Sequence, residues 1–167
     1  LNIPEKLKRG DEIDGYKLTL SLIQNDRTWV CEKDNEEYVI KFAPYEALEN
    51  DDILHLYIKE VWNAKRLKAG FFPNSEVPEN RTARYYIMKK LDGITLKQYL
   101  KKRTLSVDDA ITLTKTLLAM SQYLLKFNLV HGDIKPENII VMQRNDKRIF
   151  KVIDFGSITE IFSLTNK

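Results

Sequence analysis

Cysteine, glycine and long apolar runs are scarce in this chain of 167 residues. Its single cysteine, Cys31, excludes an intramolecular disulfide and a cysteine-rich metal site, and it suits a reducing compartment, which we take to be the cytoplasm. No apolar run reaches about 18 residues, so we expect no membrane-spanning helix and no membrane partner. The formal net charge of +3 is too small to indicate a nucleic-acid partner.

The chain otherwise has the composition of an ordinary globular protein, with 43% hydrophobic and 31% charged residues. Its length fits one domain, or two small lobes that share a cleft. We expect a lead-in segment over residues 1–15, a first lobe over residues 16–91 and a second lobe over residues 92–167. Because the first residue is Leu1 rather than methionine, we interpret the chain as a piece of a longer polypeptide.

The first lobe carries strand patterns and one helical pattern. Helical spacing of apolar residues predicts a long helix over residues 47–68, before Gly70. Alternating polar and apolar residues predict strands, and the candidates are residues 16–22, 28–32, 38–42, Val77 and 85–88. This part should therefore form a five-stranded antiparallel sheet with one long helix. The second lobe should be mainly helical, with helices over residues 95–103 and 107–127.

Two side chains with oxygen ligands, Asn138 and Asp154, stand sixteen positions apart. An apolar run follows the first and another precedes the second, and polar residues 143–148 separate the runs, which predicts a β-hairpin. The hairpin would bring both side chains to one end. A hard cation such as Mg²⁺ could bind there, with phosphate oxygens completing its shell.

A carboxylate and an ammonium group precede this hairpin. Asp133 can accept a proton from an attacking hydroxyl, and Lys135 can meet a transferring phosphoryl group. Turn preference would explain each Asp or Asn singly, but it does not explain their joint spacing. We therefore predict phosphoryl transfer, with Asp133 and Lys135 as catalytic residues and with Asn138 and Asp154 as metal ligands. His131 is expected to be a packed, hydrogen-bonded imidazole rather than a second base.

Residues 131–138 read H-G-D-I-K-P-E-N, and residues 154–156 read D-F-G. In this order, with a short hairpin between them, they resemble the catalytic loop and the D-F-G motif of the protein kinase superfamily. The resemblance implies an α+β fold of the protein kinase type, ATP as phosphoryl donor and Mg²⁺ as metal. The chain stops eleven residues after Gly156, where relatives continue, so we expect an incomplete, mainly helical C-terminal lobe.

Upstream residues resemble the rest of the nucleotide site. Residues 39–41 look like the V-A-I-K strand, whose lysine, here Lys41, contacts the α- and β-phosphates. Glu60 is the expected ion-pair partner of this lysine, and Glu46 and Glu49 are the alternatives.

The adenine pocket is also expected in this part of the chain. Met88 resembles the residue at the back of that pocket, although core packing alone would explain it as well. Lys90 lies in the linker whose backbone would bond the adenine edge.

Two features depart from the family pattern. Ile23, Asn25 and Thr28 stand where the family has the three glycines that let backbone N–H groups approach the phosphates. β-Branched side chains would stiffen this loop, so we expect weakened phosphate contact. Gly132 replaces the arginine that pairs with a phosphorylated activation segment, so activation by that route is not expected.

The substrate class depends on the residues after the catalytic aspartate. Lys135 followed by P-E-N resembles Ser/Thr protein kinases, so a protein substrate is expected. The alternatives are a small-molecule kinase of the aminoglycoside or choline phosphotransferase type, and a nucleotide-binding regulatory pseudokinase module. The apolar faces of residues 107–127 and 158–164 lack cover, so we expect self-association or a missing C-terminal region.

Overall fold

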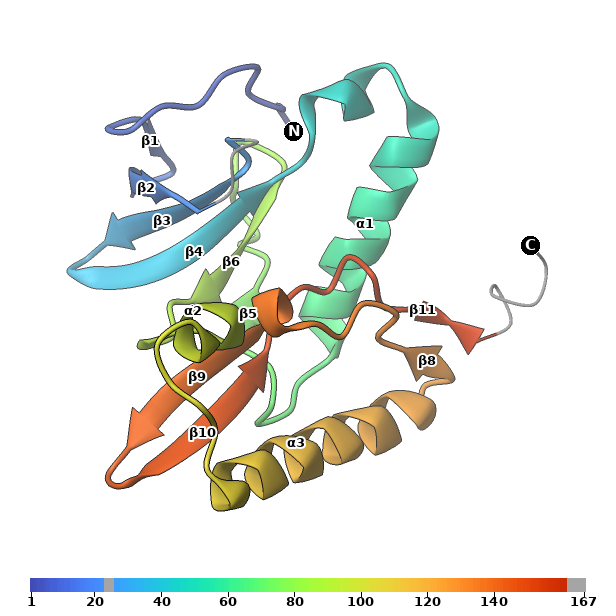
Figure 1. Ribbon diagram of the computed structural model, residues 1–167. Coiled ribbons are helices and arrows are strands. Elements are labelled where there is room, and N and C mark those ends of the chain that lie inside the picture. The colour runs from blue at the N-terminus through green and yellow to red at the C-terminus, as the bar shows by residue number, and fades with distance from the viewer. Residues whose placement is uncertain (23–25, 162–167) are drawn as a thin grey trace. The chain divides into compact units, whose positions relative to one another are not determined.

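The computed structural model describes residues 1–22 and 26–161 of the chain. It divides into two compact units, which consist of Leu1–Leu67 with Asn74–Lys90, and of Lys68–Pro73 with Leu91–Lys167 (Figure 1). The segment expected as a separate lead-in belongs to the first unit. Lys68–Pro73, which the sequence placed in the first lobe, belongs to the second.

The first unit is built on a six-stranded antiparallel sheet in the order β1-β2-β3-β4-β6-β5. Its strands are β1 (Glu12–Ile13), β2 (Tyr16–Ser21), β3 (Thr28–Lys33), β4 (Glu36–Phe42), β5 (Ser75–Glu76) and β6 (Tyr85–Lys89). The predicted count of five strands was wrong for the described residues, because the short β1 lies where the lead-in segment was expected.

One long helix, α1 (Asp51–Arg66), accompanies this sheet. Asn50 caps its N-terminus: its side chain accepts hydrogen bonds from the N–H groups of Asp52 and Ile53, which satisfies free donors at the start of the helix. The predicted helix over residues 47–68 merged α1 with the preceding 3₁₀ turn, η1 (Tyr45–Leu48).

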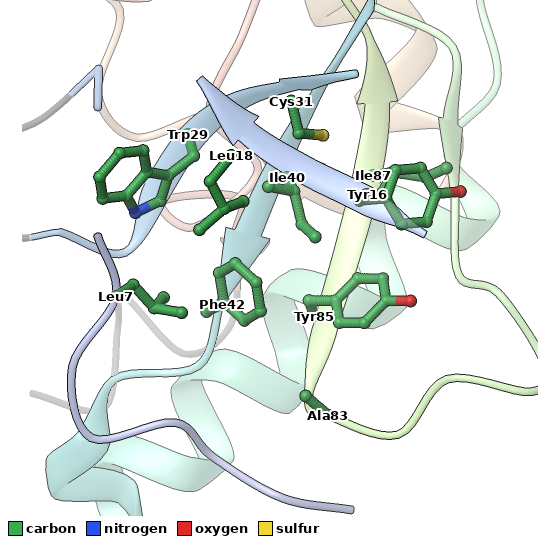
Figure 2. Packing of buried hydrophobic residues seen from close by; sticks show 10 residues of the cluster. All are labelled: Leu7, Tyr16, Leu18, Trp29, Cys31, Ile40, Phe42, Ala83, Tyr85 and Ile87. Carbon is green, nitrogen blue, oxygen red and sulfur yellow. The ribbon is translucent and has the colours of Figure 1, made fainter. Parts of the chain in front are cut away.

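The core of the first unit lies on one face of the sheet (Figure 2). Trp29 and Cys31 of β3 contribute to it together with Ile40 and Phe42 of β4. The other members of the cluster are Leu7, Tyr16, Leu18, Ala83, Tyr85 and Ile87. Burial raises the pKa of the Cys31 thiol to about 12, so this cysteine is a small core residue and not a reactive one.

The N-terminal segment, expected as a separate lead-in, packs onto the first unit. Ile3 and Leu7 are buried, at 3% and 7% exposure. The buried Arg27 guanidinium donates hydrogen bonds of 2.7 Å to the Pro4 carbonyl and 3.0 Å to the Glu5 carbonyl. Ile3 and Leu7 form no periodic pattern in this polar stretch, so sequence patterns could not reveal their packing.

Asp14 connects the turn between β1 and β2 to the segment before β6. Its carboxylate accepts hydrogen bonds from the Thr82 N–H at 2.9 Å, the Thr82 hydroxyl at 2.8 Å and the Tyr85 hydroxyl at 2.7 Å. Burial raises the pKa of Asp14, but these hydrogen bonds outweigh it and hold the pKa below the ordinary value of 3.8.

This lowered pKa makes the stability of the first unit depend on pH. A carboxyl group with a depressed folded pKa stabilises the protein above its unfolded pKa and loses that contribution as pH falls through the folded value. We expect Asp14→Asn to lower the free energy of unfolding by about 1–3 kcal/mol at neutral pH and by less near pH 3. Urea unfolding at both pH values measures this. Asp34→Asn, at an exposed turn position with φ 52°, is the control, and an equal loss at both pH values would contradict the assignment.

The second unit contains two α-helices among its described residues, α2 (Leu96–Leu100) and α3 (Val107–Leu125). It also contains more strand than was predicted. β7 (Gly93–Thr95), β9 (Ile139–Arg144) and β10 (Lys147–Val152) form a sheet in the order β10-β9-β7, and β8 (Leu129–Val130) pairs with β11 (Thr159–Glu160).

The hairpin predicted around residues 143–148 is present as β9 and β10, which pair from Lys147 opposite Arg144 to Val152 opposite Ile139. The buried face of this hairpin packs on α2 and on Leu113 and Leu117 of α3. The buried residues of this cluster are Leu96, Tyr99, Ile139, Val141 and Phe150. The Val152 N–H also donates to the Phe71 carbonyl at 2.7 Å, which attaches the segment Lys68–Pro73 to this unit.

The expected uncovered apolar faces are only partly present. Along α3, Val107, Leu118 and Leu125 are 77%, 59% and 55% exposed. Ile158, expected to be uncovered, is buried at 1% exposure, and residues 162–164 lie outside the described residues. No helix in the described ranges is both long enough and apolar enough to cross a membrane.

Candidate active site

One group of the predicted site residues lies in the first unit and is an ion pair between Lys41 on β4 and Glu60 on α1. The Glu60 side chain is 9% exposed and that of Lys41 is 26% exposed. The Tyr86 hydroxyl donates a 2.6 Å hydrogen bond to Glu60 Oε1, and the Tyr57 hydroxyl donates one of 3.1 Å to the Lys41 carbonyl. The structure thus pairs the two residues that the sequence selected, and Tyr57 and Tyr86, which sequence reasoning missed, hold them.

Met88 lies in β6, the strand that pairs with the Lys41 strand β4, and Lys90 directly follows β6. Met88 is buried in β6 opposite Val39, which puts it on the face of the sheet that carries Lys41. The Lys90 N–H donates to the Glu37 carbonyl at 3.3 Å, and the Lys90 ammonium lies 3.8 Å from the Glu37 carboxylate. That N–H is therefore engaged, so a contact from Lys90 to an adenine edge would fall to its carbonyl oxygen.

Of the three residues at the expected glycine positions, the structure describes one. Thr28 is the first residue of β3 and is buried, at 6% exposure. Its carbonyl accepts a 2.9 Å hydrogen bond from the Leu22 N–H, which closes the base of the turn between β2 and β3. Ile23 and Asn25 lie outside the described residues.

Asp133, Lys135 and Asn138 form one cluster in the second unit. Lys135 Nζ lies 3.0 Å from Asp133 Oδ2. Asn138 Nδ2 donates to the Asp133 carbonyl at 3.0 Å and to Asp133 Oδ2 at 3.2 Å. The 3₁₀ turn η2 (Pro136–Asn138) brings these side chains together. Asp133 and Lys135 remain 40% and 48% exposed, so a substrate can reach them.

The contact between Lys135 and Asp133 stabilises the charged form of both side chains. The hydrogen bond from the Lys135 ammonium lowers the pKa of Asp133 below 3.8, and the Asn138 amide adds to the effect. The same contact raises the pKa of Lys135. At neutral pH, Asp133 is therefore a carboxylate that can orient a hydroxyl and accept its proton, and Lys135 is a cation.

Asn138 and Asp154 lie at the same end of the hairpin, Asn138 directly before β9 and Asp154 two residues after β10. The Ile153 N–H donates to the Asn138 carbonyl at 2.9 Å. Asp154 has φ 77°, and its Oδ1 accepts a 2.9 Å hydrogen bond from the Gly156 N–H. Because Asn138 Nδ2 donates to Asp133, the amide oxygen of Asn138 remains as an acceptor. A carboxylate and an amide oxygen on neighbouring strand ends are ligands that suit Mg²⁺, so the residues present fit this metal.

His131 occupies the structural role expected from the sequence. It is 3% exposed, and its Nδ1 accepts a 3.3 Å hydrogen bond from the Asp133 N–H. Burial lowers the pKa of His131 despite the nearby carboxylates of Asp154 and Asp133. The imidazole is therefore neutral at pH 7 and positions the backbone that carries Asp133.

Gly132 is required by the backbone at this point. Its φ is 83°, and a Cβ atom there would lie 2.9 Å from the Ser157 carbonyl oxygen. An arginine at this position would be strained and would crowd that oxygen. The departure from the family pattern thus has a local steric cause.

One pair beside the cluster was missed by sequence reasoning. Lys97 on α2 lies 2.9 Å from Glu137 in η2, and this hydrogen bond lowers the pKa of Glu137. The two residues are forty positions apart and neither belongs to a repeating pattern, so the sequence held no signal for the pair.

Comparison with known proteins places the chain in a family. The sequence profile of the family described as "Protein kinase domain" matches residues 28–166. The curated protein named "Probable serine/threonine-protein kinase PknB", from Lactococcus lactis subsp. lactis (strain IL1403), is 32% identical over 114 residues, which are 65% of this chain and 17% of that protein. "Probable serine/threonine-protein kinase HSL1" of Saccharomyces cerevisiae (strain ATCC 204508 / S288c) is 37% identical over 82 residues, which are 48% of this chain and 5% of that protein.

A solved structure shares the fold. The crystal structure of a double mutant of the Mycobacterium tuberculosis PknI kinase domain matches with a TM-score of 0.67 and 18% identity, over 92% of this chain and 63% of that one.

The chain belongs to the protein kinase domain family. The predicted family and the predicted α+β kinase-like fold are thereby confirmed. The chain spans 17% and 5% of the lengths of the two curated relatives, and 63% of the PknI structure.

Proposed function

We propose that the chain transfers the γ-phosphoryl group of ATP to a Ser or Thr hydroxyl of a protein substrate. The observation that carries this is the cluster of Asp133, Lys135 and Asn138 at the end of the hairpin that leads to Asp154. Charge neutralisation and positioning are what phosphoryl transfer requires. The names of both curated relatives as serine/threonine-protein kinases support this substrate class. The proposal includes a cytoplasmic location, where ATP is abundant.

Each residue of the cluster has a role in this proposal. Asp133 orients the substrate hydroxyl and takes its proton while the hydroxyl oxygen bonds to the γ-phosphorus and the bond to the ADP oxygen breaks. The Lys135 ammonium neutralises charge on the phosphoryl oxygens during the transfer. Asn138 and Asp154 would hold Mg²⁺, which supplies positive charge to the phosphates when it is bound.

The first unit would hold the nucleotide. The Lys41 ammonium, fixed by Glu60, anchors the α- and β-phosphates. Met88 closes the back of the adenine pocket, and the Lys90 backbone meets the adenine edge.

A second function, a nucleotide-binding regulatory module with little activity, is favoured by one observation. Thr28 stands in place of a loop glycine at the start of β3. A small-molecule kinase is disfavoured by Lys135, which with P-E-N after it resembles the pattern of Ser/Thr protein kinases. Incorporation of labelled phosphate into a Ser- and Thr-containing protein, against none into aminoglycoside or choline, separates these functions.

The nucleotide site is tested by calorimetry. We expect Mg²⁺-ATP to bind the chain, and Asp154→Asn to abolish the Mg²⁺-dependent part of the binding, because a neutral amide is a much weaker ligand than a carboxylate. Asparagine is chosen over alanine because it tolerates the positive φ and keeps an oxygen for the Gly156 N–H. Titration of ATP with EDTA measures the metal-independent part.

Two results would count against this assignment. The absence of Mg²⁺-ATP binding to the unsubstituted chain would remove the nucleotide site. Equal binding to the Asp154→Asn variant would show that the metal is held elsewhere.

Self-association through α3 is part of the proposal. Val107, Leu118 and Leu125 expose apolar surface along the helix, and a second copy would cover it. We expect the mass from light scattering to rise with concentration and the double variant Leu118→Lys, Leu125→Lys to stay monomeric. Leu56→Lys, at a residue of α1 that is 64% exposed, is the control. A monomer at every concentration would refute the association.

A further inference from the structure

The hydroxyl group of Thr28 is buried without a hydrogen-bond partner among the described residues. The residue as a whole is 6% exposed. Buried polar groups in folded proteins nearly always have a partner, so an exception calls for an explanation. One explanation is a partner that is not part of the chain.

The register of the sheet decides which face the Thr28 side chain occupies. Thr28 lies directly opposite Lys41 in the pairing of β3 with β4, and directly opposed residues point to the same face with their Cβ atoms about 4.5–5.5 Å apart. The next pair, Trp29 and Ile40, points to the other face and belongs to the core (Figure 2). The Thr28 hydroxyl is therefore on the face of Lys41 and away from the core.

Lys41 has a neighbouring hydroxyl on each side. Tyr86 lies opposite Lys41 in the pairing of β4 with β6, and its hydroxyl donates to Glu60. Thr28 lies opposite Lys41 on the β3 side. The Tyr86 hydroxyl thus bonds Glu60, the ion-pair partner of Lys41, whereas the Thr28 hydroxyl has no hydrogen-bond partner among the described residues.

The backbone at Thr28 is held on both sides. The Arg27 carbonyl accepts a 2.9 Å hydrogen bond from the Phe42 N–H, and the Thr28 carbonyl accepts one from Leu22. The Arg27 guanidinium is itself fixed by carbonyls of the N-terminal segment. A hydroxyl on such a backbone is preorganised, so little conformational freedom is lost when it binds a ligand.

We propose that the Thr28 hydroxyl donates a hydrogen bond to an α- or β-phosphate oxygen of the nucleotide that Lys41 anchors. The inference rests on the proposed function, which places those phosphates at Lys41. A side-chain hydroxyl then does at this position what a backbone N–H does in a glycine-rich loop. Thr28 therefore contributes to phosphate affinity. A threonine at this expected glycine position does not remove the phosphate contact.

The test removes the hydroxyl while keeping the shape of the side chain. Thr28→Val is expected to weaken Mg²⁺-ADP binding about tenfold, which corresponds to roughly 1.4 kcal/mol, and to leave adenosine binding unchanged. Thr28→Ser, which keeps a hydroxyl, is expected to stay close to the unsubstituted chain. Calorimetry with ADP and with adenosine gives both affinities.

Thermal unfolding without ligand supplies a second readout. Because the hydroxyl is unpartnered among the described residues, Thr28→Val is expected to keep or raise Tm in the absence of nucleotide and to reduce the rise in Tm that ADP causes. Thr82→Val, which removes a hydroxyl that bonds Asp14, is the matched control and is expected to lower Tm while leaving ADP affinity unchanged.

The outcomes separate this inference from the proposed function. If the unsubstituted chain binds ADP and Thr28→Val binds it equally well, the role of Thr28 is refuted and the nucleotide site stands. If Thr28→Val lowers Tm without ligand as Thr82→Val does, the hydroxyl has an internal partner and the inference is also refuted. If the unsubstituted chain binds no ADP, the nucleotide site and the role of Thr28 fall together.

Discussion

Asp133→Asn is expected to lower the rate of phosphoryl transfer by about 10²–10⁴-fold, the usual contribution of a general base. The reason lies in the charge of Asp133, whose pKa is lowered by the Lys135 ammonium so that the side chain is ionised at neutral pH. An asparagine keeps the shape and an oxygen for the Asn138 amide, but it cannot take a proton from the substrate hydroxyl. Transfer of labelled γ-phosphate to a protein substrate measures the loss.

Nucleotide binding separates a catalytic role from a structural one. Because Asp133 is not among the proposed metal ligands, Asp133→Asn should bind Mg²⁺-ATP with an affinity close to that of the unsubstituted chain. Asp146→Asn, which makes the same change at an exposed position in the turn between β9 and β10, should leave both transfer and binding unchanged. Retention of near-full transfer by Asp133→Asn would show that another group accepts the proton.

The sequence predicted those parts of the site in which residues are close along the chain. Asp133, Lys135 and Asn138 lie within six consecutive positions, and a hairpin of predictable length brings Asp154 to Asn138. Such local contacts follow from turn and strand preferences that a single sequence displays. The prediction of Glu60 required a family pattern, because helix periodicity alone left Glu46 and Glu49 as alternatives.

What could not be predicted depends on residues that are distant in the chain. The buried Arg27, directly before β3, donates hydrogen bonds to the Pro4 and Glu5 carbonyls, so the segment expected as a lead-in is part of the first unit. The family pattern has an arginine at the position of Gly132, and only the nearby Ser157 carbonyl oxygen shows that a side chain there has no room. These are tertiary contacts, which leave no periodic trace in the sequence.

The remaining large effect concerns Lys41. Lys41→Met is expected to lower the free energy of unfolding by about 3 kcal/mol, because it leaves the buried Glu60 carboxylate without its counter-charge. Lys89→Met is the control, since its ammonium lies 4.0 Å from Glu36 and both side chains are more than half exposed. An exposed pair of this kind contributes about 0–1 kcal/mol. Urea unfolding of the variants measures the difference.

A second substitution distinguishes the stabilising role of Lys41 from its binding role. The double variant Lys41→Met, Glu60→Gln carries no unpaired charge, and the amide oxygen of the introduced glutamine can still accept the Tyr86 hydrogen bond, so most of the lost stability should return. Binding of Mg²⁺-ATP should not return, because no ammonium remains to meet the phosphates. If the double variant were as unstable as the sum of its single variants, the Lys41–Glu60 pair would not be coupled. If it bound Mg²⁺-ATP normally, Lys41 would not be the phosphate anchor.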